Sequence, residues 1–148
     1  GDGFDDVLVG SLYNDAAGDG AGAVYLVLGP ASGDVDLASA DAKFIGEPFT
    51  NTYTSSGAGD VDGDGFDDIL VGADSKNTAY LVLGPASGAV DLADADITLI
   101  GAGIEDQAGT SVSGAGDVDG DGFDDILVGA QASGSYAGAA FLVYATSL

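Results

Sequence analysis

Short runs of apolar residues, separated by turn-forming residues, recur along the whole chain. Each run holds about four to six residues rich in Val, Ile, Leu, Tyr or Phe and is bounded by Gly, Asp, Ser or Pro, which is typical of β-strands joined by turns. No apolar pattern continues at helical spacing for long, and the stretches at 36–41 and 91–96 are predicted to form one helical turn at most. The hydrophobic pattern therefore predicts an all-β chain.

Two blocks of sequence occur more than once. GAGDVDGDGFDDILVGA stands at Gly57–Ala73 and again at Gly114–Ala130, and the chain opens at Gly1 within the second half of the same motif. YLVLGPASG stands at Tyr25–Gly33 and again at Tyr80–Gly88. The blocks define a unit of about 60 residues, a period typical of propellers and solenoids, and four short strands in each unit favour a propeller blade.

The repeats divide the chain into about two and a half units. Residues 1–49 are predicted to form a partial blade with its second to fourth strands, residues 50–107 a complete blade, and residues 108–148 a partial blade with its first to third strands. The predicted fold is a partial β-propeller of four-stranded antiparallel blades. A closed propeller needs about four to eight blades. We therefore expect the chain to be a segment of a longer protein, whose open edges pair with the remaining blades or with a second copy.

An acidic loop lies inside each copy of the longer block. Asp60–Asp68 carries carboxylates at loop positions one, three, five and nine, and Asp117–Asp125 has the same nine residues. Ca²⁺ takes about six to eight oxygen ligands in a flexible shell, which alternate side chains of a tightly curled loop can supply. The carbonyl at position seven can add an oxygen, and the loop glycines permit the positive φ values that such a curl requires. The predicted Ca²⁺ ligands are Asp60, Asp62, Asp64, Phe66, Asp68, Asp117, Asp119, Asp121, Phe123 and Asp125.

A third, partial calcium site is predicted at Asp2, Phe4 and Asp6, which match the last part of the loop. An EF-hand is excluded because position twelve is Val71 or Val128 rather than Glu, and because the flanking runs predict strands rather than helices. The alternative to a metal site is a solvated acidic turn. We expect the loop phenylalanines to pack between loop and blade, and the aspartates at position eight to be solvated or hydrogen-bonded rather than ligands. These residues are Phe4, Phe66, Phe123, Asp5, Asp67 and Asp124.

The charge balance of the chain is strongly acidic. There are 25 acidic residues against two basic ones, a formal net charge of −23, and no His or Cys. Two cations cannot neutralise a run of phosphates, which excludes nucleic-acid binding and a polybasic membrane contact. The lack of His and Cys excludes an ordinary zinc site, disulfides and thiol chemistry. The apolar runs are too short to span a bilayer.

The sequence offers no catalytic constellation. Glu47 and Glu105 fall in equivalent turns before the two complete acidic loops, and recurrence in each repeat favours a structural role over a catalytic one. Since there is also no nucleophile–base pair, the chain is predicted not to be an enzyme. Tyr13, Tyr53 and Tyr136 are expected in variable loops, where they are candidate contacts for a protein or glycan partner.

Together these motifs resemble FG-GAP repeats, the blades of integrin α-subunit propellers and of many bacterial surface and secreted proteins. The resemblance covers essentially the whole chain and rests on the DxDxDGxxD loop followed by an apolar strand. It implies a propeller with Ca²⁺ on one rim. The expected function is that of a calcium-binding structural, adhesion or protein-interaction module of a larger extracellular protein, secreted or at the cell surface. The alternative is a non-catalytic or substrate-binding propeller portion of a secreted hydrolase or lyase.

Overall fold

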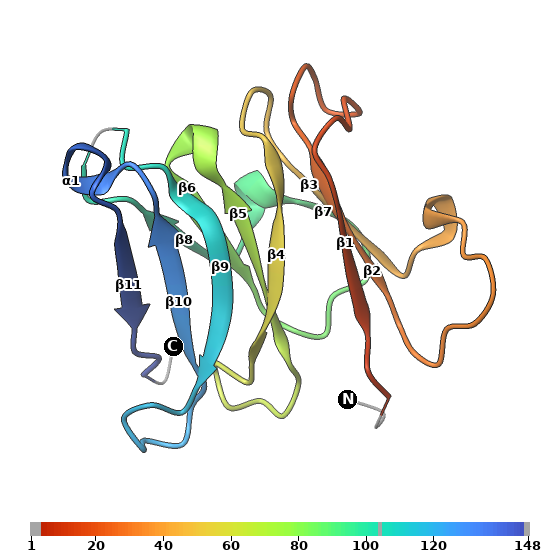
Figure 1. The fold of residues 1–148 in the computed structure, drawn as a ribbon. Helices are drawn as coiled ribbons and strands as arrows, with labels where there is room; N and C mark the ends of the chain where they lie inside the picture. The colour runs from red at the N-terminus through yellow and green to blue at the C-terminus, as the bar shows by residue number, and fades with distance from the viewer. Residues whose placement is uncertain (1–3, 104, 147–148) are drawn as a thin grey trace.

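Three β-sheets are stacked next to one another (Figure 1). The computed structural model describes residues 4–103 and 105–146. Within them the first sheet has the strand order β1-β2-β3-β7, the second β4-β5-β6-β8 and the third β11-β10-β9. The strands are β1 (Val7–Ser11), β2 (Ala23–Val27), β3 (Ala42–Ile45), β4 (Thr52–Gly59), β5 (Asp68–Ala73), β6 (Thr78–Val82), β7 (Gly88–Asp91), β8 (Ile97–Ile100), β9 (Ala108–Gly116), β10 (Asp125–Ala130) and β11 (Ala139–Val143).

The second sheet lies between the other two and is covered on both faces. Successive side chains of its strands point to opposite faces, so β5 and β6 contribute to both cores. All six residues of β5 are buried. Ile69 and Val71 pack in a core cluster with Phe44 of the first sheet, whereas Leu70 packs with Ile126 of the third. Each boundary between sheets is therefore a hydrophobic core. This face-to-face stacking confirms the predicted all-β fold, a partial β-propeller in which each sheet is a blade.

One strand departs from the predicted set of antiparallel four-stranded blades. β7 lies within the predicted second blade at 50–107, yet it pairs in parallel with β3 of the first sheet, where Gly88 stands opposite Ala42. The other pairings between these strands are antiparallel. Leu92, directly after β7, is fully buried in the core between the two sheets, and this burial contributes about 1.5–3 kcal/mol. The crossing strand thus joins two blades and covers an edge of the first.

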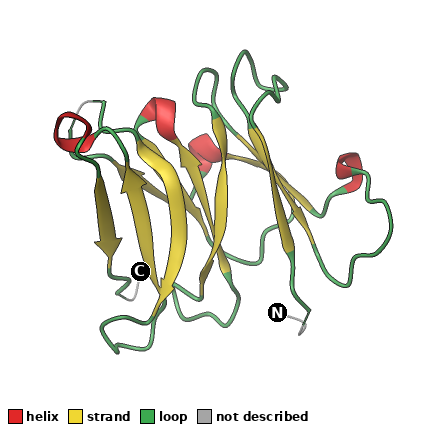
Figure 2. Ribbon diagram, in the orientation of Figure 1, coloured by secondary structure: helices red, strands yellow, loops and turns green. Residues whose placement is uncertain are grey.

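Helical turns lie in the connections between strands in the described part of the chain (Figure 2). Two 3-10 turns, η1 (Leu37–Ser39) and η3 (Leu92–Asp94), stand where the sequence predicts one helical turn at most. The carboxylates of Asp36 and Asp91 cap them by accepting a backbone N–H. The remaining short helices are η2 (Asp74–Lys76) and α1 (Ser133–Tyr136). No helix among the described residues is both long and apolar enough to cross a bilayer.

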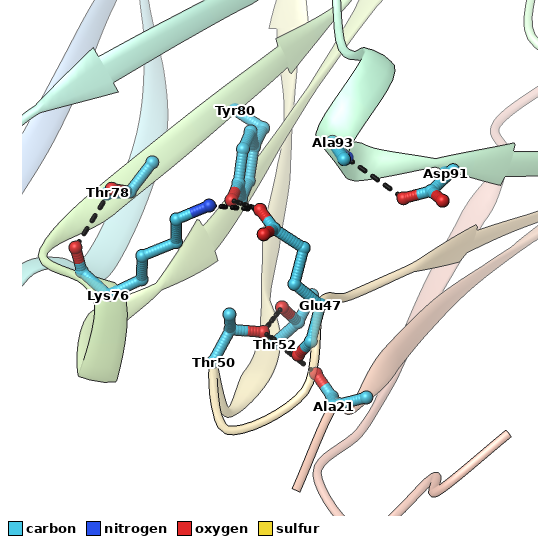
Figure 3. A network of polar contacts seen from close by, with 9 residues as sticks. All are labelled: Ala21, Glu47, Thr50, Thr52, Lys76, Thr78, Tyr80, Asp91 and Ala93. Atoms are coloured by element: carbon cyan, nitrogen blue, oxygen red, sulfur yellow. Dashed lines mark hydrogen bonds and ion pairs between the residues drawn. The ribbon is translucent and has the colours of Figure 1, made fainter. Parts of the chain in front are cut away.

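A polar network links the connection between β3 and β4 to the second sheet (Figure 3). Glu47 forms an ion pair with Lys76 of η2, and the hydroxyl of Tyr80 in β6 donates to the same carboxylate at 3.0 Å. The hydrogen-bonded ion pair lowers the pKa of Glu47 and raises that of Lys76, while burial raises the pKa of Tyr80. The Thr50 hydroxyl donates to the carbonyl of Ala21 at 3.1 Å in the same network. Glu47 therefore has a structural role.

Candidate metal centre

The two complete acidic loops connect equivalent strands and lie on one edge of the molecule. Asp60–Asp68 leads from β4 into β5, and Asp117–Asp125 leads from β9 into β10. Both loops lie at the lower edge of the molecule in Figure 1, and α1 and the connection from β1 to β2 lie at the opposite edge. The propeller therefore gathers its acidic loops on one rim.

The first aspartate of each loop holds the turn together. The carboxylate of Asp60 accepts the N–H of Gly63 at 2.7 Å and that of Gly65 at 3.0 Å. These glycines have φ values of 80° and 91°, a conformation that residues with a Cβ disfavour. Asp117 makes the corresponding bonds in the second loop. The predicted positive φ values are confirmed, and they curl the loop around its first carboxylate.

Three carboxylates converge in each loop. One oxygen each from Asp60, Asp62 and Asp68 lies within 4.8 Å of the other two. The corresponding group in the second loop is Asp117, Asp119 and Asp125. Ca²⁺ lies about 2.3–2.6 Å from its oxygen ligands, so oxygens this close can share one ion. Hard carboxylate oxygens suit a hard divalent cation, and these three side chains could hold one in each loop.

Positions five and seven take a different part in the loop. Asp64 lies outside the converging group, and its carboxylate accepts the N–H of Phe66 at 2.8 Å. Asp121 and Phe123 form the same contact at 3.0 Å. Coordination by the two aspartates, and by the carbonyls of the two phenylalanines, stays a prediction.

Position nine is the buried end of each loop. Asp68 and Asp125 are both 0% exposed, at the start of a strand. The two oxygens of Asp68 accept the N–H of Val61 and that of Gly84, both at 2.8 Å. These contacts tie the loop to the end of β6. Because each carboxylate oxygen has a further lone pair, the same side chain can also face a metal ion.

Two of the candidate ligands are held less acidic than usual. Burial raises the pKa of Asp68; two backbone N–H donors oppose this change, and nearby loop carboxylates add to it. In the second loop, desolvation and repulsion from neighbouring carboxylates raise the pKa of Asp119. Both effects disfavour the ionised form that binds a metal. A divalent cation would reverse the balance, because a nearby positive charge favours an ionised carboxylate.

The predicted partial third site falls only partly within the described residues. Asp2 lies outside them. Asp6 accepts the N–H of Gly29 at 2.8 Å, the same contact that Asp68 makes with Gly84. Phe4 is 56% exposed. Metal binding at this site stays a prediction.

The residues at positions seven and eight differ between the two complete loops. Phe123 packs against the core cluster that contains Val61, whereas Phe66 is 44% exposed. Asp124 accepts the N–H of Asp60 at 3.0 Å, a bond that crosses from one blade to the next. The sequence predicts a solvated or hydrogen-bonded aspartate at position eight, but it does not identify the partner of Asp124. The sequence repeat could have indicated this contact, since stacked repeats place copies of one loop next to each other.

Comparisons with known proteins identify the repeats. The FG-GAP repeat family model matches residues 52–92 and 108–143, which include both complete acidic loops. Integrin alpha-5 of Xenopus laevis is 33% identical over 143 residues, which cover 87% of this chain. Integrin alpha-V of Gallus gallus is 32% identical over 142 residues and 88% of this chain. Integrin alpha pat-2 of Caenorhabditis elegans is 37% identical over 92 residues, 57% of this chain and 8% of its own length.

The similarity concerns a small part of these relatives. The chain spans 13% of integrin alpha-5 and 14% of integrin alpha-V. Within that part, the matched repeats coincide with the stacked sheets and with the acidic loop that leads into β5 and into β10. The chain therefore belongs to the FG-GAP repeat family and folds as a partial β-propeller.

Proposed function

We propose that this chain is a calcium-binding propeller segment that serves as a structural, adhesion or protein-interaction module of a larger extracellular protein. The observation that carries the proposal is the convergence of three carboxylate oxygens within 4.8 Å in each of two loops. Two loops of identical sequence form the same group at equivalent places in the fold. A solvated acidic turn has no need to bring like charges together, because their repulsion disfavours it.

Calcium is the ion that these loops suit best. Mg²⁺ requires an octahedron with ligands at about 2.0–2.1 Å and releases its water reluctantly. Ca²⁺ accepts a larger and less regular shell, which three carboxylates, loop carbonyls and water can complete. Extracellular calcium modules often bind at about 10⁻⁴–10⁻³ M, and we propose an affinity in this range.

The interaction role is supported by relatives and by the layout of the propeller. Integrin α-subunits are similar to this chain over its repeats. This similarity, with the resemblance to surface and secreted proteins, supports an extracellular location and a non-enzymatic role. Tyr13 and Tyr136 are 87% and 85% exposed, in the β1–β2 connection and in α1. Figure 1 places both segments on the edge opposite the acidic loops. Tyr53 differs from the prediction, because it lies within β4 rather than in a loop. We propose that calcium stiffens one rim while the other contacts a protein or glycan partner.

A thermal melt tests the calcium proposal. The chain is melted with chelator, with millimolar Mg²⁺ and with millimolar Ca²⁺ at matched ionic strength. Because bound ligand stabilises the native state by mass action, we expect the highest melting temperature in Ca²⁺. At a free concentration about 100 times the dissociation constant, one site adds about 2.7 kcal/mol.

The matched control is the double variant Asp62→Asn with Asp119→Asn, which removes one candidate ligand from each loop. We expect it to melt at the same temperature with and without Ca²⁺. Equal melting temperatures of the unmodified chain in all three solutions would show that the loops are acidic turns only.

A further inference from the structure

The two acidic loops touch each other, although they belong to different sheets. The N–H of Asp60 donates to Oδ2 of Asp124 at 3.0 Å, and the N–H of Asp124 donates to the carbonyl of Asp60 at 3.1 Å. Asp60 is one of the converging carboxylates of the first loop. Asp124 directly precedes Asp125, one of the converging carboxylates of the second. A residue beside one candidate ligand therefore holds the backbone of another.

The contact is also closely packed. A Cβ at Gly59 would lie 2.0 Å from Oδ2 of Asp124, and a Cβ at Gly63 would lie 2.6 Å from Cε1 of Phe123. The second loop thus fits against backbone that only glycine leaves open. In the second loop itself, a Cβ at the equivalent Gly116 or Gly120 would meet no described atom within 4 Å. The first loop is braced by a neighbour, and the second is not braced in this way by any described residue.

We propose that a divalent cation bound at the second loop strengthens cation binding at the first, through Asp124 and Phe123. The proposal rests on the calcium function proposed above. An ion held by the second loop fixes the turn that carries these two residues. A fixed turn keeps Asp60 in place, so less conformational entropy is lost when the first loop binds its own ion. By linkage, an ion in the first loop strengthens binding at the second by the same factor.

Electrostatic repulsion between the ions does not reverse this coupling. Each loop contains five aspartates, so a loop that holds one divalent cation keeps a net negative charge. At physiological salt the Debye length is about 8 Å, which screens what interaction remains between exposed charges. We therefore expect the contact through Asp124 to outweigh the remaining repulsion, and the sign of the measured coupling tests this.

Calcium titration of the full chain, followed by amide NMR signals, tests the proposal. Gly63 and Gly65 report on the first loop, and Gly120 and Gly122 report on the second, so each dissociation constant is measured separately. Asp119→Asn disables the second loop but leaves Asp124 in place. We expect it to weaken binding at the first loop about fivefold or more, the usual lower range of coupling between sites.

Variants of Asp124 separate positioning from charge. We expect Asp124→Ala to weaken the first loop by about the same factor as Asp119→Asn, with no further loss when the two are combined, because both act through one contact. Asp124→Asn keeps an oxygen acceptor, so we expect affinity close to that of the unmodified chain. The matched control is Asp67→Ala, at the equivalent exposed position of the first loop, which should leave both loops unchanged.

Two results would overturn the coupling. One is an unchanged affinity of the first loop in Asp119→Asn, and the other is an equal loss in Asp67→Ala and Asp124→Ala. Should Asp124→Ala fail to fold, Asp119→Asn and Asp124→Asn still decide the question. If neither loop of the unmodified chain responds to Ca²⁺, the proposed calcium function itself fails, which is a different result from two loops that bind independently.

Discussion

The loops Asp60–Asp68 and Asp117–Asp125 have the same nine residues in two different environments. Val61, at position two of the first loop, is 2% exposed, whereas Val118 of the second is 52% exposed. The cause lies in the neighbouring sheet: Val61 packs with Ile126 and Ala145 of the third blade. Local sequence thus sets the shape of the loop, and the adjacent blade sets its burial.

What the loops share is as informative as what separates them. In both, the carboxylate at position nine is fully buried and its two oxygens accept backbone N–H groups. These bonds join the loop to its own sheet, so they do not depend on the next blade. The comparison therefore separates contacts within a blade, which occur in both copies, from contacts between blades, which the described residues form at the first loop.

The largest expected effect tests the shared contact. Asp68→Ala and Asp125→Ala each leave two backbone N–H groups without their charged acceptor, which we expect to lower the free energy of unfolding by about 3 kcal/mol. Urea unfolding in the presence of chelator measures this without a contribution from metal. The two variants should agree within about 1 kcal/mol. A large difference between them would contradict the view that position nine acts within its own blade.

The next effect tests the contact that differs. Val61→Ala removes buried apolar surface and leaves a cavity, so we expect it to lower the free energy of unfolding by about 2 kcal/mol. Val118→Ala is the matched control in an identical local sequence, and we expect a change within about 0.5 kcal/mol. Denaturant unfolding of both variants measures the difference. Equal losses would show that the third blade does not shield the first loop.

The features that the sequence predicted are those that each repeat determines by itself. Strands, turns, the positive φ of Gly63 and Gly65, and an acidic loop on one rim all follow from local patterns. The carboxylates at positions one, three and nine converge, and metal binding by the predicted ligand set stays a prediction.

The features that the sequence did not predict arise between repeats. The short GAVD segment of β7 has no pattern that distinguishes pairing with its own sheet from pairing with β3 of the first. In the same way, Asp67 and Asp124 are identical in local sequence, yet only Asp124 meets a neighbouring loop among the described residues. Such contacts depend on tertiary stacking, which propensity and spacing do not encode.

A pair of glycines sharpens the comparison further. Gly59 and Gly116 stand before the two loops with φ values of 81° and 70°, so alanine is disfavoured at both by about 1 kcal/mol or more. Only at Gly59 would the new Cβ displace Asp124. We therefore expect Gly116→Ala to lower the free energy of unfolding by about 1 kcal/mol and Gly59→Ala by about 2 kcal/mol. Thermal unfolding of the pair measures this, and equal values would mean that the inter-loop bond adds no stability.

The boundary between the first and second blades extends the comparison to the polar contacts that join blades. The contacts there include the ion pair of Glu47 with Lys76, which lies beside the hydrogen bond from the Tyr80 hydroxyl to the same carboxylate. The side chains of Lys76 and Glu47 are 41% and 32% exposed, so solvent screens their attraction. We expect this ion pair to contribute less stability than the buried contacts above.

Glu47→Gln measures that smallest effect through its pH dependence. Lys76 holds the pKa of Glu47 below its ordinary value of 4.5 in the folded state, so the ionised form is favoured by folding. The stability from this shift is complete above the ordinary pKa and is lost as the pH falls through the folded pKa. Glutamine keeps an acceptor for the Tyr80 hydroxyl but has no charge. We therefore expect the variant to be less stable by about 0.5–1 kcal/mol near pH 7, and we expect the difference to vanish at a pH below the folded pKa of Glu47. Urea unfolding of both proteins at each pH, with chelator, cancels the titration of the aspartates that they share. A difference that persists unchanged at the lower pH would assign the effect to packing against Tyr80 and not to the ion pair.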